Sequence, residues 1–226
     1  SAGSSLGRFG RFTPPALINN LNNASQQALQ GNQPGNQKAQ PTPISATATV
    51  IPKTYDGTTA ANLTGAALTR SGNNLSLVNG STGAYVSKNV GSAIPVTTSM
   101  GITGSDASLF QFTTPNLVGV ITAKALTIDP AAPSAVAPKI YDGTVNATVT
   151  AGSLLGLVTG GTLGTRTAVG TFADKNIGTK NVVALYTLVD GVNPLHLAMN
   201  YTLAGETLTG TITAKDLSVF NGLVTT

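Results

Sequence analysis

The chain of 226 residues contains no cysteine and no tryptophan, and only 9% of its residues are charged. The absence of cysteine excludes disulfide bonds and thiolate chemistry. Charged residues usually make up about a quarter of a soluble chain, so Thr, Ser, Asn, Gln and Gly must provide most of the contact with water. Aromatic residues amount to 5%. This composition favours thin cores of small side chains and disfavours a deep catalytic pocket.

Long apolar runs are also missing. No stretch approaches the roughly 18 residues of a membrane-spanning helix, and the first residues lack the basic-then-apolar pattern of a signal peptide. The net charge is +4, and Arg8, Arg11 and Lys38 all precede the first acidic residue, Asp56. These bases do not form the stripe typical of a nucleic-acid interface. We therefore expect neither nucleic acid nor a membrane span among the partners.

What the sequence does contain is a tandem repeat. Three motifs occur twice in the same order: Pro52-Lys53-Thr54-Tyr55-Asp56-Gly57-Thr58 and Pro138-Lys139-Ile140-Tyr141-Asp142-Gly143-Thr144; Lys88-Asn89-Val90-Gly91 and Lys175-Asn176-Ile177-Gly178; Gly119-Val120-Ile121-Thr122-Ala123-Lys124 and Gly210-Thr211-Ile212-Thr213-Ala214-Lys215. The closing copies lie further apart than the opening ones, so the second repeat carries extra residues before its last strand. The repetition predicts two small domains.

The repeats have the pattern of strands and turns. Ala46, Ala48 and Val50 alternate with polar residues, which is the period of a strand. Asp56-Gly57 is typical of a type I′ hairpin turn, in which both positions need positive φ, and Lys88-Asn89 suggests a left-handed Asn. We predict an all-β fold of two small domains, each an Ig-like sandwich or a β-grasp-like sheet, joined end to end with Asp129–Pro133 stiffened by two prolines. The predicted strands are 44–55, 63–68, 75–78, 84–86, 94–98 and 117–127, then 134–141, 147–157, 166–172, 181–189, 200–203 and 207–217.

The predicted boundaries are an extension at 1–43, repeats at 44–128 and 129–217, and a tail or a further strand at 218–226. Within the extension, Thr13-Pro14-Pro15 is a plausible helix start, and apolar residues follow at helical spacing. Two interpretations stay open: a disordered linker, or a segment that docks on a repeat or a neighbouring subunit. The candidate assembly residues are Phe9, Phe12, Leu17, Ile18 and Leu21.

The repeated motifs, together with Asn200-Tyr201-Thr202-Leu203, resemble the YDG/MBG-type repeats of large bacterial surface proteins, including filamentous-haemagglutinin-like, two-partner-secreted adhesins. The resemblance covers about residues 45 to 220. The first repeat departs from it with Ser87 in place of Asp174 and Phe110 in place of Tyr201. The resemblance implies an exported, non-enzymatic β-domain that is used in series as a stalk or adhesive surface, outside the cell or on the bacterial surface.

The residues of the repeat signature have structural explanations. Tyr55 and Tyr141 are predicted to be core residues whose hydroxyls bond the backbone, and Asp56-Gly57 and Asp142-Gly143 are explained by turn geometry. Lys53 and Lys139 are expected to lie over the tyrosine rings, the alternative being a cross-link to Asn or Asp.

No catalytic, metal or cofactor site is predicted, since His196 is the single histidine and belongs to an expected loop. The expected function is a structural or adhesive repeat of a bacterial surface or matrix fibre. The alternatives are a filament subunit that polymerises through residues 1–43, and a module that binds glycans or host surface proteins. The expected partners are copies of the chain or further repeats.

Overall fold

The computed structural model describes residues 40–70, 74–192 and 196–218. Regular structure in this part of the chain consists of strands and two single 3₁₀ turns, η1 (Ala107–Leu109) and η2 (Ala198–Asn200). The all-β prediction with two tandem domains is therefore confirmed. None of the described segments is a helix long and apolar enough to span a bilayer. The predicted helix after Thr13 and the assembly residues Phe9, Phe12, Leu17, Ile18 and Leu21 lie outside the described residues.

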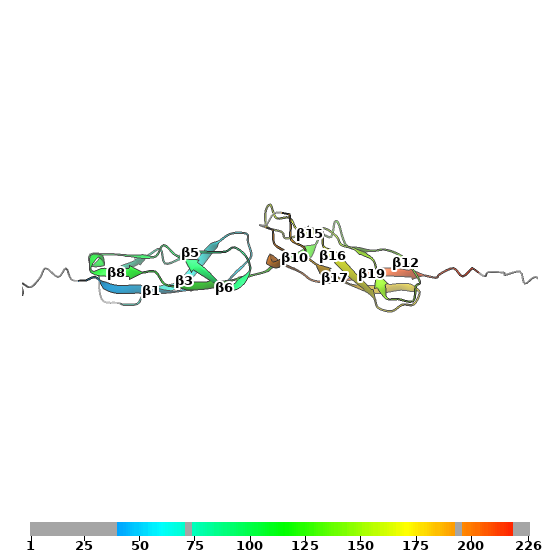
Figure 1. Cartoon of the computed structure of the whole chain (residues 1–226), viewed down its shortest axis with the longest axis horizontal. Helices are drawn as coiled ribbons and strands as arrows, with labels where there is room; N and C mark the ends of the chain where they lie inside the picture. Colours follow the sequence, from blue (N-terminus) through cyan, green and yellow to red (C-terminus); the bar gives the residue numbers. More distant parts are fainter. Residues whose placement is uncertain (1–39, 71–73, 193–195, 219–226) are drawn as a thin grey trace, which may run out of the picture. The chain divides into compact units, whose positions relative to one another are not determined.

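The first repeat is built from strands β1 to β9 (Figure 1). Their bounds are β1 (Thr42–Val50), β2 (Lys53–Thr54), β3 (Ala60–Leu68), β4 (Ser76–Val78), β5 (Thr82–Tyr85), β6 (Gly91–Thr97), β7 (Gly101–Thr103), β8 (Phe110–Thr113) and β9 (Leu117–Thr122). The sequence pattern missed β7 and β8, which are short. In β1, Ile44, Ala46 and Val50 are buried, as the period of two predicts.

The second repeat is built from β10 to β19. The bounds are β10 (Lys124–Ile128), β11 (Ala135–Val136), β12 (Lys139–Ile140), β13 (Asn146–Ala147), β14 (Val149–Thr150), β15 (Leu154–Leu155), β16 (Thr167–Phe172), β17 (Gly178–Thr187), β18 (Tyr201–Leu203) and β19 (Glu206–Thr213). The last predicted strand extends to residue 217, whereas β19 ends at Thr213. Residues 214–218 are not a strand in this structure.

The two repeats share an arrangement of five strands, to which the first repeat adds β1 and β8. The strand order β2-β9-β6-β5-β3 in the first repeat matches β12-β19-β17-β16-β13 in the second. In each, the short strand of the opening motif runs parallel to the closing strand: Lys53 pairs with Ile121, and Lys139 pairs with Ile212. The duplicated motifs therefore occupy equivalent places, which confirms that one fold has been built twice.

The repeats differ where the second one contains prolines. β1 is continuous in the first repeat, whereas the matching stretch of the second is divided into β10 and β11 by Asp129–Pro133. Proline cannot donate to a ladder, and the Asp129 carboxylate accepts a hydrogen bond from the Ala131 N–H at 2.9 Å. The Asp129 N–H donates to the Ser153 carbonyl at 2.8 Å. This segment is a bonded turn inside the second repeat.

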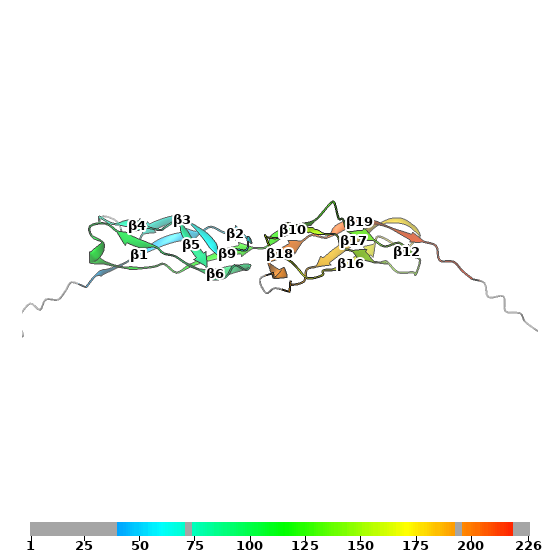
Figure 2. The ribbon, with the colours of Figure 1, turned by 90° about the horizontal axis from the view of Figure 1, so that it is seen from above.

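Strand β10 precedes the boundary predicted at residue 129, yet it pairs with β15 and β18, which both follow that boundary. β10 lies next to β15 in Figure 1 and next to β18 in Figure 2. Only Ala123 separates β10 from β9, the closing strand of the first repeat. The chain therefore passes from one repeat into the next without a free linker.

The cores depend on a close approach at the closing motif. A Cβ on Gly119 would lie 2.8 Å from the ring of Tyr85, and a Cβ on Gly210 would lie 2.9 Å from the ring of Phe172. Real Cβ atoms do not tolerate such contacts, so glycine at this point lets an aromatic ring cross the closing strand in each repeat. The ring is buried in both cases.

Two predicted turn geometries are wrong. Gly57 has φ +82° and Gly143 has φ +79°, but neither preceding aspartate has positive φ, and β2 does not pair with β3. The Asp-Gly pair is therefore not a type I′ hairpin, because β2 leaves this turn to join the closing strand instead. Asn89 and Asn176 do not have positive φ either, so their recurrence needs another explanation.

Candidate functional site

The opening motif folds into a compact polar cluster, here called the signature cluster, of Lys53, Asp56 and Thr58. The Asp56 Oδ1 atom accepts hydrogen bonds from the Thr58 N–H at 2.8 Å and the Thr58 hydroxyl at 2.9 Å. The Lys53 ammonium donates to the same oxygen at 2.8 Å and to the Thr58 carbonyl at 2.8 Å. Burial would raise the pKa of Asp56, but the hydrogen bonds from Lys53 and Thr58 outweigh it and lower the pKa overall.

The second copy, of Lys139, Asp142 and Thr144, has the same geometry. The Thr144 N–H donates to Asp142 at 2.8 Å, and the ammonium of Lys139 lies 2.9 Å from that carboxylate. The hydrogen bond from Lys139, followed by that from the Thr144 N–H, lowers the pKa of Asp142 to about 2. Both clusters have an ionised carboxylate at neutral pH whose Oδ1 is already occupied by donors, which is a structural arrangement and a poor general base.

The repeated lysines lie over aromatic rings other than the predicted ones. The Lys53 Nζ atom is 5.7 Å from the centre of the Tyr85 ring, and the Lys139 Nζ atom is 5.9 Å from the centre of the Phe172 ring. The expected partners were Tyr55 and Tyr141, on the assumption that the strand continued. β2 and β12 are only two residues long, so the alternation does not extend to the tyrosines.

Tyr55 belongs instead to a contact between the repeats, here called the junction. Its side chain is 2% exposed, and its ring packs edge-on against Tyr201 of the second repeat with 5.3 Å between ring centres. Edge-to-face pairs of this kind add roughly 0.5–1.5 kcal/mol beyond area burial. Burial is the main cause that raises the pKa of Tyr55, whereas the Asn200 side chain acts in the opposite direction.

Asn200 is the polar centre of the junction and is completely buried. Its Oδ1 atom accepts a hydrogen bond from the Val90 N–H at 2.9 Å, and its Nδ2 atom donates to the Asn89 Oδ1 atom at 2.9 Å. A buried amide without such partners would cost several kcal/mol. The recurrence of Asn89 and Val90 is thus explained by what they bind in the neighbouring repeat.

A strand pairing completes the junction. β10 belongs to the second repeat but follows the closing strand of the first after a single residue, and it runs parallel to β18, with Lys124 opposite Tyr201 and Leu126 opposite Leu203. Leu126 is 3% exposed and packs in the same apolar cluster as Tyr55 and Tyr201. Backbone pairing, an aromatic contact and a buried amide therefore meet at one place.

His196 lies beside the junction in a pocket of about 370 Å³ that also contains Asp56 and Lys88. Its Nδ1 atom is 3.2 Å from both the N–H and the hydroxyl oxygen of Thr162. A search of residues 40–70, 74–192 and 196–218 finds no group of three His, Asp or Glu side chains placed to hold a metal ion.

A polar cluster that the sequence did not predict lies in the second repeat. The Ser134 hydroxyl donates to the Glu206 carboxylate at 2.7 Å, accepts from the Gly152 N–H at 3.0 Å and lies 2.8 Å from the Tyr186 hydroxyl oxygen. Tyr186 donates to Glu206, and burial together with this bond raises its pKa. Ser134 is buried, and its contacts hold together three segments of the second repeat. Its partners are far apart in the chain, so no local motif marks them.

The two signature tyrosines have unlike surroundings, which gives a matched test. Tyr55 is 2% exposed, whereas Tyr141 is 37% exposed. We expect Tyr55→Ala to lower the free energy of unfolding by about 3 to 5 kcal/mol, as for other buried aromatic residues, and Tyr141→Ala by about 1 kcal/mol. Urea unfolding followed by circular dichroism measures both. Equal losses would show that the junction does not hold Tyr55.

The depressed pKa of Asp142 predicts a pH dependence. Because its folded pKa of about 2 lies below the ordinary value of about 3.9, its contribution to stability is present above pH 4 and is lost as the pH falls toward 2. Lys139→Met should move the titration of this carboxyl up toward the ordinary value. NMR titration of the Asp142 side chain provides the measurement. An unchanged midpoint in the variant would contradict the assigned cause.

A comparison with known families agrees with this duplicated geometry. The model of the YDG domain matches residues 37–116 and again residues 122–210. The second match begins just before β10, the strand that pairs with β15 and β18 of the second repeat. The search of curated proteins and the search of solved structures each gave no match. On the two family matches, which together cover most of its length, the chain belongs to the YDG domain family.

Proposed function

We propose that the chain is a non-enzymatic structural and adhesive repeat unit of a bacterial surface or matrix fibre. In this role the YDG repeats act in series, each joined to the next by contacts that the repeated motifs supply. The proposal places the protein outside the cell. Its partners would be further repeats, and the adhesive contacts would be with glycans or host surface proteins.

The observation that carries the proposal is the use made of the repeated residues. Asp56 and Lys53 bind each other and Thr58, and Asn89 binds Asn200 of the next repeat. The polar side chains of the repeated motifs are thus hydrogen-bonded to one another or to the neighbouring repeat. They stabilise a loop and connect two domains. Such contacts suit a stalk, because each of its domains must be stable and firmly joined to the next domain.

The composition supports the same role. Only 9% of the residues in the chain are charged, so salt should affect its interactions weakly. A chain without cysteine also folds independently of redox conditions. The junction adds rigidity because its strand pairing follows directly on the closing strand β9. The filament hypothesis rests on residues 1–43, most of which lie outside the described part of the chain, so it stays a prediction.

The location is tested on intact cells of the bacterium that produces the protein. Antibodies raised against the purified chain should label whole cells or their extracellular matrix, and brief protease treatment of intact cells should remove the label. A cytosolic protein probed in parallel must remain protected, which controls for lysis. Labelling that is seen only after the cells are broken would contradict the proposal.

A further inference from the structure

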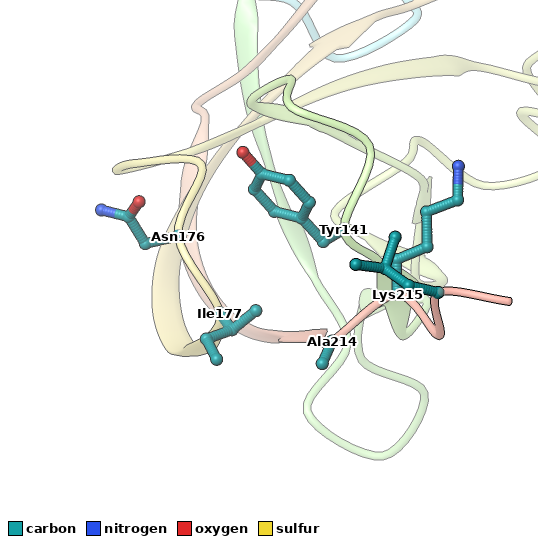
Figure 3. A pocket seen from close by; sticks show the side chains of 6 residues that line it. Tyr141, Asn176, Ile177, Ala214 and Lys215 are labelled. Carbon is teal, nitrogen blue, oxygen red and sulfur yellow. The ribbon is translucent and has the colours of Figure 1, made fainter. Parts of the chain in front are cut away.

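The second repeat has an open pocket of about 430 Å³ at the end of its closing strand. Figure 3 shows the ring of Tyr141 between the loop that carries Asn176 and Ile177 and the chain at Ala214 and Lys215. The pocket is mainly apolar. Its lining residues are Tyr141, Asn176, Ile177, Ala214, Lys215 and Leu217.

Each residue of this pocket has a counterpart in the first repeat or in the strand β10 that follows it, and every counterpart takes part in or adjoins the junction. The correspondence follows from the duplicated motifs. In the same order, the counterparts are Tyr55, Asn89, Val90, Ala123, Lys124 and Leu126. The open pocket therefore occupies the place in the second repeat that corresponds to the junction surface of the first.

The two sets of residues differ in burial. All six pocket residues are exposed, whereas all six counterparts are buried or half-buried. The largest contrast is between Leu217, which is 88% exposed, and Leu126, which is 3% exposed. Apart from this, the surface is already formed: the Tyr141 N–H donates to the Thr213 carbonyl at 2.8 Å, as the Tyr55 N–H does to the Thr122 carbonyl at 2.8 Å.

We infer that this pocket is the acceptor for one more YDG repeat joined in series after the second one, and that it selects a repeat with Asn-Tyr directly after its 3₁₀ turn. This deepens the structural function proposed above and rests on it. The Asn side chain would bind Asn176 and the Ile177 N–H, and the Tyr ring would pack against Tyr141. The selection is thus for an amide and an aromatic ring at fixed places.

The first repeat shows why the selection matters. Its 3₁₀ turn η1 ends at Leu109, and β8 begins with Phe110, at the places that Asn200 and Tyr201 occupy after η2. Leu109 is 61% exposed, and a leucine can neither accept from Ile177 nor donate to Asn176. A repeat of the first kind would leave those groups buried without partners. The pocket therefore accepts repeats of the second kind only.

The departing chain supplies the remaining contact. Residues 215–218 follow β19 as β10 follows β9, but they are not a strand here. With a further repeat in place they would run parallel to its Tyr-Thr-Leu strand, as Lys124, Ala125 and Leu126 run beside Tyr201, Thr202 and Leu203. Docking and strand formation would occur together.

A three-repeat chain tests the inference. Residues 1–218 are followed directly by residues 128–226 of the same sequence, so that Ser218 precedes Ile128 as Thr127 does in the natural chain. The amide of the Ile177 in the 1–218 part should then exchange with deuterium at least about tenfold more slowly than in the two-repeat chain. The reason is that it gains a buried acceptor, as the Val90 amide has. Slow exchange of the Val182 amide in the appended copy shows that the third repeat has folded, because this residue lies in the core.

The matched control changes only the appended copy, with Asn200→Leu and Tyr201→Phe, which reproduces the pair found in the first repeat. This control should leave Ile177 exchanging as fast as in the two-repeat chain. Equal exchange of this Ile177 amide in the two-repeat chain, the three-repeat chain and the control would overturn the inference. Failure of the third repeat to fold after this connection would overturn it as well. Protection of Ile177 in the two-repeat chain that grows with concentration would identify a second copy as the occupant and would also overturn it.

These measurements use purified protein and do not depend on where the bacterium places it. Failure of docking would leave surface labelling unaffected, and absence from the cell surface would leave docking unaffected. The two proposals therefore fail separately.

Discussion

The buried amide of Asn200 is the constraint on which the arrangement of the two repeats depends. An amide removed from water must have its hydrogen bonds satisfied, and here the partners are Asn89 and the Val90 N–H of the other repeat. A junction held by apolar contact alone would tolerate sliding. The amide fixes one register, and the ring pair of Tyr55 and Tyr201 supplies apolar burial around it.

The repeats share a fold and differ at their ends. Five strands have the same order in both sheets, and β1 and β8 extend the sheet of the first repeat to seven strands. In each repeat the opening motif supplies a two-residue strand that pairs with the closing strand. The differences lie in Leu109 and Phe110 compared with Asn200 and Tyr201, and in the prolines that divide β10 from β11. The fold of each repeat is thus encoded by the residues that occur in both. The contact between the repeats also depends on Asn200 and Tyr201, which have no counterpart of the same type in the first repeat.

Much of this could be predicted from the sequence. Alternation in β1 and the duplicated motifs gave the all-β class and the two domains, because both are local patterns. The side-chain roles were harder: Asn89 was attributed to turn geometry, and Lys53 was placed over Tyr55 instead of Tyr85. These errors have one cause, since the partners lie in other strands or in the other repeat, and no local period reports on them. The absence of Asn-Tyr from the first repeat was visible as a substitution, but its meaning required the junction.

The central claim is that Asn89 and Asn200 join the repeats by direct interaction, and a double-mutant cycle tests it most directly. Asn89→Ala, Asn200→Ala and the double variant are compared by urea unfolding, with the pair Asn176→Ala and Asn200→Ala as the control. The account predicts a coupling free energy of about 0.5 to 3 kcal/mol for the first pair and none for the control. A coupling near zero for both pairs would contradict the claim.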